Sequence, residues 1–207
     1  MKQSRFFLNR LLQTLREISN KNCIPLTVEF QKDIAWFNTF LDKFNGVSFF
    51  NKPKIEGEIH LNASAKALGA HFENEIYHLP LDRVYTSSDI TMLEMLNILV
   101  AVKIWSSNWQ HEHILVHCDN LAVVTILTTG KTKEQTLATI ARNIWLQCAT
   151  HDIQLTVTHV AGTKNTLADL LSRWTNSAKD IADLNTLLPS HSWLKLAKDI
   201  IFLNDNI

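Results

Sequence analysis

The chain has 207 residues, of which 46% are hydrophobic and 19% charged, a balance typical of one globular domain with an appendage and not of a disordered chain. Twenty basic and twenty acidic residues give a formal net charge of zero, so nucleic-acid binding would need a local basic patch instead of a strong overall charge. The apolar runs fall short of the roughly 20 residues that cross a bilayer, and the scattered cysteines are typical of reduced thiols; we expect an intracellular protein, nuclear or cytoplasmic, with no membrane partner.

Two helices are predicted at the start of the chain. Apolar residues recur at helical spacing over residues 4–19, with arginines between them. The same spacing returns over residues 27–46, where Asn45 and Gly46 are typical of a helix end. We expect a helical extension over residues 1–50.

From residue 55 the apolar spacing changes from helical to alternating. Ile59 and Leu61 alternate with polar residues, and residues 67–81 suggest two further strands joined by a hairpin tip at 73–75. Strands and helices then follow in turn: a helix at about 91–107, a strand at 113–120, helices at 121–129 and 133–152, a strand at 153–162 and a helix at 163–174. This alternation predicts an α/β fold with a mixed or parallel sheet flanked by helices.

Three carboxylates come from three separate elements of this predicted fold. Asp119 ends a predicted strand, while Glu94 and Asp169 lie in predicted helices. Oxygen ligands that converge in this way suit Mg²⁺ or Mn²⁺. Each residue also has an ordinary structural explanation: Glu94 as a residue of the first helical turn, Asp119 as the cap of the helix that follows, and Asp169 as a solvated helical position.

The segments around these acids are more specific than the acids themselves. "LEMLNILVAVKIW", "VHCDNLAVV" and "HVAGTKNTLADLLSRW" resemble the type-1 RNase H domain that follows reverse transcriptase in retroelements, most closely in the DIRS-like, tyrosine-recombinase group. The first 50 residues resemble the thumb and connection segment that precedes that domain. The resemblance implies an RNase H-like domain over 55–174 and leaves 175–207 as a helical tail, with a helix at about 193–202.

The resemblance implies a five-stranded mixed sheet whose first three strands are antiparallel, and four acidic ligands for two Mg²⁺ or Mn²⁺ ions. Glu94, Asp119 and Asp169 match the second, third and fourth ligands, whereas the first position holds Asn62. His159 matches an auxiliary histidine that assists proton transfer or product release, although a strand-end histidine with no such role is an equal alternative.

The implied partners are an RNA·DNA hybrid and the rest of a reverse transcriptase. A hybrid would be bound through its backbone and 2′-hydroxyl groups. The candidate contact residues, each of which is also compatible with an ordinary solvated surface, are Lys131, Lys133, Arg142, Asn143 and Lys164.

Asn62 decides what activity to expect. An amide keeps the shape of a carboxylate but offers a metal one neutral oxygen, and a charge pair about 4 Å apart contributes about 4 kcal/mol at an effective dielectric of 20. We therefore expect an impaired or inactive RNase H, in which Asn62 is either an introduced substitution or a natural loss. The alternative is a domesticated, non-catalytic module that binds nucleic acid or protein; an integrase or transposase core is disfavoured because Asp169 stands where those enzymes usually have glutamate.

Overall fold

The computed structural model describes Leu12, Leu15 and residues 27–43, 54–83, 85–196 and 200. Its elements in chain order are α2 (Val28–Lys43), β1 (Gly57–Ala63), β2 (Ala67–Phe72), β3 (Glu75–Pro80), η1 (Ser87–Asp89), α3 (Ile90–Trp105), β4 (His113–Cys118), α4 (Leu121–Thr129), α5 (Gln135–Thr150), β5 (Gln154–His159), η2 (Gly162–Lys164), α6 (Thr166–Ser172), α7 (Ala178–Leu187) and β6 (Ser192–Trp193). The predicted helix over 4–19 falls outside the described residues, apart from Leu12 and Leu15, which are helical.

The strands form one mixed sheet in the order β5-β4-β1-β2-β3-β6. β1, β2 and β3 are antiparallel neighbours, and β4 and β5 continue the sheet in parallel from β1. The turn between β2 and β3 uses Glu73 at a φ of 51°, within the predicted hairpin tip. The predicted fold class is therefore confirmed, with β6 as an additional strand.

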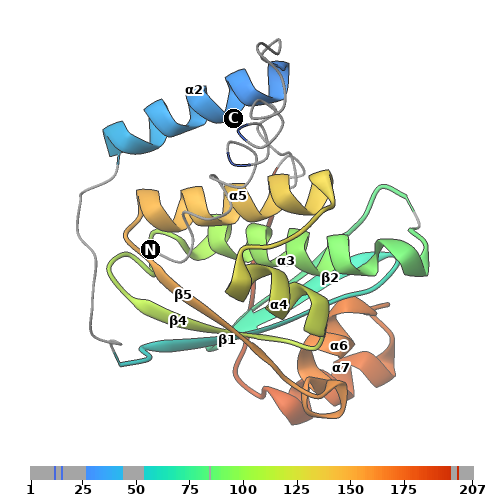
Figure 1. The fold of residues 1–207 in the computed structure, drawn as a ribbon. Coiled ribbons are helices and arrows are strands. Elements are labelled where there is room, and N and C mark those ends of the chain that lie inside the picture. Colours follow the sequence, from blue (N-terminus) through green and yellow to red (C-terminus); the bar gives the residue numbers. More distant parts are fainter. Residues whose placement is uncertain are drawn as a thin grey trace.

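Helices cover the two faces of the sheet unequally (Figure 1). α3 lies against one face and α5 packs on α3, with α2 beyond α5. The residues of β1 that point to α3, Ile59 and Leu61, are fully buried, as are Trp105 and Trp109 at the end of α3 and just after it. This face holds the main core of the domain.

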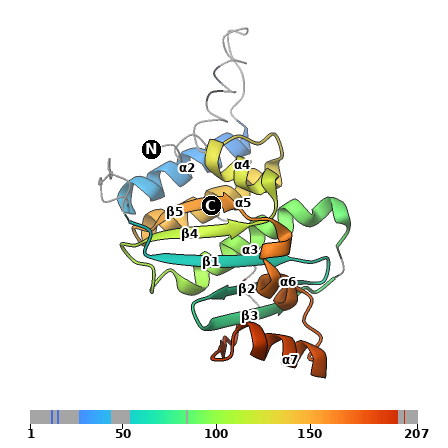
Figure 2. The same ribbon diagram turned by 90° about the horizontal axis from the view of Figure 1, so that it is seen from below.

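The opposite face is covered by α6 and α7 over only part of its area (Figure 2). α6 approaches the sheet closely at Gly69 in β2, where a Cβ atom would lie 2.4 Å from the backbone nitrogen of Ser172. A side chain at this position would meet backbone, which has no room to move aside. Gly69 thus allows α6 to rest directly on the strand next to β1.

The C-terminal region differs from its prediction. Trp193, expected to begin a helix, lies in β6, which pairs in parallel with β3. A helix that the sequence pattern did not predict, α7, precedes it and begins with a capping box between Ser177 and Asp180. The larger part of the predicted helix over 193–202 falls outside the described residues. Within the described residues, no helix is long and apolar enough to span a membrane.

Candidate active site

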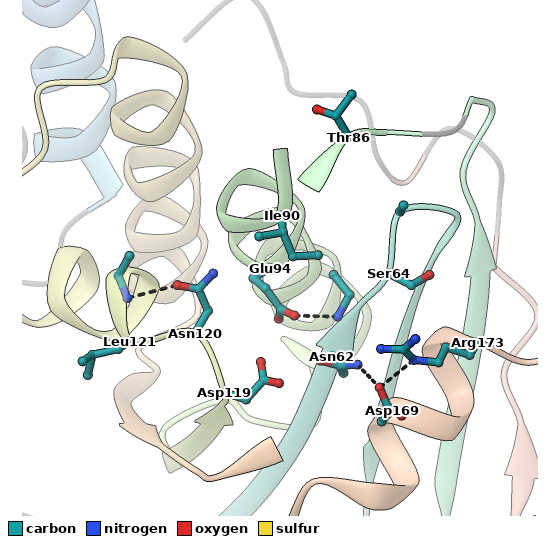
Figure 3. Close-up of a pocket in the computed structure, with 13 residues that line it drawn as sticks. Asn62, Ser64, Thr86, Ile90, Glu94, Asp119, Asn120, Leu121, Asp169 and Arg173 are labelled. Atoms are coloured by element: carbon teal, nitrogen blue, oxygen red, sulfur yellow. Dashed lines mark hydrogen bonds and ion pairs between the residues drawn. The ribbon is translucent and has the colours of Figure 1, made fainter. Parts of the chain in front are cut away.

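A pocket of about 660 Å³ opens where β1 and the neighbouring parallel strand β4 end. Its lining includes residue 62 of β1 and all three carboxylates that the sequence placed in a site: Asn62, Glu94, Asp119 and Asp169. Figure 3 shows Asn62 between Glu94 and Asp169, with Asp119 on the other side of the opening. The fold thus brings together side chains from a strand, a strand end and two helices.

Glu94 is a buried carboxyl and not a solvated residue of the first helical turn. It is the fifth residue of α3 and is 1% exposed. Its Oε1 accepts a hydrogen bond from the backbone N–H of Ala63 at 2.7 Å. Burial raises the pKa of Glu94 to about 8, with Asp119 acting in the same direction and the Ala63 N–H opposing both. At neutral pH without a cation, Glu94 is therefore largely protonated.

Asp119 lies directly after β4 and is free of the capping role that its position suggested. Asn120 caps α4 instead, because its Oδ1 accepts hydrogen bonds from the N–H groups of Ala122 and Val123. Burial raises the pKa of Asp119, Asp169 adds to the increase, and His159 and Arg173 oppose it. Desolvation and the neighbouring Asp169 carboxylate therefore both disfavour the ionised form of Asp119.

Asn62 acts as a hydrogen-bond donor toward Asp169. Its Nδ2 donates to Asp169 Oδ1 and to Ser172 Oγ, both at 3.0 Å. The Ser172 hydroxyl in turn donates to the carbonyl of Asp169 at 2.9 Å, so its oxygen is available to accept. On the outer side, Arg173 Nε lies 2.8 Å from the same Oδ1 of Asp169. The amide and the guanidinium together provide the positive partners of this carboxylate.

Two buried amide side chains hold β1 in place. Asn97, fully buried in α3 and not identified from the sequence, donates through Nδ2 to the carbonyls of Asn62 and Gly69. Asn165, the residue before α6, makes no side-chain cap; it donates to the carbonyl of Leu61 at 2.9 Å. The available signal for Asn97 was a polar residue inside an otherwise apolar helix, three positions after Glu94.

Comparison with known proteins found a similar family for part of the chain. Residues 77–175, slightly less than half of the chain, match the protein family described as "Reverse transcriptase-like". The matched range includes Glu94, Asp119 and Asp169, and it begins after β1, which carries Asn62.

Among solved structures, RNase H1 from the halophilic archaeon Halobacterium salinarum NRC-1 aligns at 15% identity over 61% of this chain and 98% of that chain, with a TM-score of 0.47. The comparison with curated proteins gave no match.

The predicted nucleic-acid contacts occupy different environments in the structure. Lys131 and Lys133 are exposed between α4 and α5, and Lys164 is exposed in η2 beside the pocket, where Gly162 approaches Asp119. The two residues in α5 are not solvent-facing. Arg142 is half-buried, and its Nε donates a hydrogen bond to the carbonyl of Ala138. Asn143 is 7% exposed, and its Nδ2 donates a hydrogen bond to the carbonyl of Thr139. His159, exposed at the end of β5, acts electrostatically on Asp119.

The donor set of this pocket fits one hard divalent cation better than two. Glu94 and Asp119 have ligand oxygens within 4.8 Å of each other, and their raised pKa values reflect the charge burial that a cation would relieve. Asp169, by contrast, already faces the Asn62 amide and Arg173. A second ion at Asp169 would meet N–H hydrogens where it needs oxygen.

Proposed function

We propose that this chain is an RNase H-type domain that binds RNA·DNA hybrid and cleaves the RNA strand weakly or not at all. The observation that carries the proposal is the hydrogen bond from Asn62 Nδ2 to Asp169 Oδ1. A metal site needs an oxygen at this point of β1, and the amide presents a donor to a carboxylate that Arg173 also neutralises. The two-metal site with which the family hydrolyses RNA in hybrids would therefore lack one of its ligands.

The remaining carboxylates define what the site can still do. Glu94 and Asp119 would hold one Mg²⁺ or Mn²⁺ ion with their oxygens. When bound, such an ion lowers the pKa of a coordinated water and polarises a phosphodiester. Asn62 and Arg173 hold Asp169 in a fixed position, and His159 would move a proton or affect product release.

Hybrid binding would rely on local charge because the net charge is zero. Lys131, Lys133 and Lys164 are exposed and available for phosphate contacts. Each contact of this kind steepens the fall of affinity with salt by roughly one unit in a log–log plot. We expect the triple alanine variant of these lysines to bind hybrid more weakly and with a shallower salt dependence.

The decisive experiment is hybrid cleavage in Mn²⁺ by the parent, Asn62→Asp and the double variant Asn62→Asp/Asp119→Asn. Several kcal/mol of lost metal affinity correspond to about 100-fold or more in rate, since about 1.4 kcal/mol is a factor of ten. Asn62→Asp should therefore cleave at least about 100-fold faster than the parent, and the added Asp119→Asn should abolish this gain. If Asn62→Asp cleaves no better than the parent, the assignment of the site is wrong.

A non-catalytic module that binds nucleic acid or protein is the second candidate function. It is favoured by the completeness of the network around Asp169, which satisfies this carboxylate without any ion. Melting of the parent with millimolar Mg²⁺ separates the two functions, because an ion that prefers the folded state must raise the melting temperature. No shift, together with no hybrid binding by fluorescence anisotropy, would favour the protein-binding module.

We further propose that the domain derives from the reverse transcriptase of a DIRS-like, tyrosine-recombinase retroelement. The match of residues 77–175 to the reverse-transcriptase-like family and the segments quoted above support this origin. A genomic sequence with no reverse transcriptase or remnant of one upstream, in any copy of the gene, would contradict it.

A further inference from the structure

A row of three histidines crosses the sheet on the face opposite α3. His60 in β1 is the direct partner of His71 in β2 and of His117 in β4. Their rings are stacked: the His60 centroid lies 5.0 Å from that of His71 and 4.2 Å from that of His117, with interplanar angles of 2° and 12°. Figure 2 looks onto this face, which α6 and α7 cover only in part. Neither the family match nor the acidic pocket explains this row.

A carboxylate completes the cluster. Glu58 lies two residues before His60 on the same face of β1, and its Oε2 is 2.9 Å from Nε2 of His117. One ligand atom each from Glu58, His60 and His117 lies within 4.8 Å of the others. An imidazole nitrogen binds an ion that lies close to the plane of its ring, so the stacked His60 and His117 rings would have to turn about their Cβ–Cγ bonds to share one ion. The Glu58 side chain is 57% exposed and that of His117 is 16% exposed, so an ion can reach the cluster from solvent.

Two of the stacked histidines have lowered pKa values. Burial lowers the pKa of His71 to about 4, and neighbouring His60 and His117 act in the same direction. Burial also lowers the pKa of His60, reinforced by His117 and opposed by Asn165 and Glu58. A neutral imidazole keeps a lone pair on one of its two ring nitrogens, and this lone pair is what binds a metal.

Behind the row lies a buried polar group that can orient His60. Asn165 is 2% exposed, its Oδ1 has no hydrogen-bond partner in the described part of the chain, and its side chain interacts with the His60 ring. Metal-binding histidines commonly use one ring nitrogen for the metal and give the other N–H to such an oxygen. Asn165 would fix the tautomer of His60 in this way.

We propose that Glu58, His60 and His117 form a Zn²⁺ site that joins β1 to β4, with water as the fourth ligand. Two imidazoles and one carboxylate are a donor set that Zn²⁺ accepts, with nitrogen and oxygen ligands about 2.0–2.2 Å from the ion. The nitrogen donors distinguish this site from the all-oxygen pair of Glu94 and Asp119, which suits Mg²⁺ or Mn²⁺. The ion would tie together the two strands whose ends carry Asn62 and Asp119.

The test is a Zn²⁺ titration of the whole chain against a competing chromophoric chelator, in millimolar Mg²⁺ to occupy hard-oxygen sites. We expect one Zn²⁺ per chain, with His117→Gln and Glu58→Gln each weakening binding at least about tenfold. Glu58→Gln changes an exposed side chain and therefore keeps the result interpretable if His117→Gln folds poorly. The matched control is His111→Gln, which removes another histidine 3.0 Å from a carboxylate, that of Asp152, and should leave Zn²⁺ affinity unchanged.

X-ray absorption at the zinc edge locates the ion independently of the variants. We expect nitrogen and oxygen ligands only. A sulfur ligand, for example Cys118, whose Sγ lies within 4.8 Å of ligand oxygens of Glu94 and Asp119, would overturn the proposal. Equal affinity in the parent, His117→Gln and Glu58→Gln, or no binding by the parent, would overturn it as well. None of these outcomes depends on hybrid cleavage.

Discussion

Asn62→Asp should destabilise the fold in the absence of metal, even though it restores the carboxylate expected in an active enzyme. In the parent, Asn62 Nδ2 donates to Asp169 Oδ1 at 3.0 Å. An ionised Asp at position 62 would place a carboxylate oxygen at about this distance from Asp169 with no hydrogen between them. The substitution therefore replaces the attraction between the side chain at position 62 and Asp169 with a repulsion, while the shape of that side chain stays the same.

The magnitude follows from two limits. Coulomb repulsion at 3 Å amounts to about 5 kcal/mol at an effective dielectric of 20 and about 1 kcal/mol in water, and the Asp169 side chain is 45% exposed, so solvent screening reduces the larger figure. The loss in the free energy of unfolding also has an upper limit, because the new Asp can take up a proton instead of staying charged beside Asp169. With an unfolded pKa of about 3.9, keeping it protonated at pH 7 costs about 4 kcal/mol. We expect a loss of about 2–4 kcal/mol at pH 7.

The same upper limit predicts the pH dependence of this loss. At pH 5 the upper limit falls to about 1.5 kcal/mol, because the new carboxyl can take up a proton at little cost. The free energy of unfolding of Asn62→Asp should thus approach that of the parent as pH falls. Asn62→Ala, which removes the hydrogen bonds without adding charge, is the control and should show a pH-independent difference from the parent.

The assay is urea or thermal unfolding in EDTA at pH 5 and pH 7, repeated with Mn²⁺. A loss of 2–4 kcal/mol corresponds to roughly 4–16 °C in melting temperature for a chain of this size. Mn²⁺ should restore stability to Asn62→Asp more than to the parent, since an ion 100-fold above its Kd adds about 2.7 kcal/mol. Equal stability of the two proteins at pH 7 in EDTA would refute the donor role of Asn62, and equal responses to Mn²⁺ would refute its place in a metal site.

Two further predictions concern the support and the protonation of the site. Gly69→Ala should cost about 1–3 kcal/mol in urea unfolding, because its Cβ would lie 2.4 Å from the nitrogen of Ser172; an unchanged unfolding midpoint would contradict the close packing of α6. The pKa of Glu94 rises from 4.5 to about 8 on folding, so stability is fully present below pH 4.5 and is lost as pH rises toward 8. Glu94→Gln keeps the acceptor for the Ala63 N–H and should flatten the melting temperature between pH 5 and 8 in EDTA, whereas a slope equal to that of the parent would contradict a buried, protonated Glu94.

The fold was predictable because its sequence signals agree with the tertiary structure. Alternation at Ile59 and Leu61 indicated β1, and Gly130 ends α4 in the left-handed conformation, with a φ of 71°. The C-terminal region was not predictable in the same way. β6 has two residues, too few for a periodic pattern, and its pairing with β3 depends on where the preceding α7 leaves the chain.

The membership of the candidate site was predictable, but the protonation and hydrogen bonding of its residues were not. The resemblance of the surrounding segments to a known family singled out Glu94, Asp119 and Asp169, and the structure places all of them along one pocket. The contacts that decide their chemistry are long-range: Glu94 to the N–H of Ala63, and Asp169 to Asn62 across 107 residues. A linear pattern shows that a carboxylate is missing at position 62 and does not show which way its amide points.

The orientation of the Asn62 amide, with its Nδ2 toward Asp169, determines how the replacement at position 62 affects the pocket. A carboxylate cluster in a partly buried pocket needs cations to offset its mutual repulsion. Here the amide of Asn62 and the guanidinium of Arg173 supply positive partners to Asp169, while protonation of Glu94 removes a further charge. The pocket can therefore keep its shape without metal, so its geometry is maintained by the fold whether or not the site cleaves RNA. Stability and hydrolysis then respond in opposite directions to the same substitution, Asn62→Asp, and measuring both in one protein separates a lost catalytic ligand from an ordinary surface change.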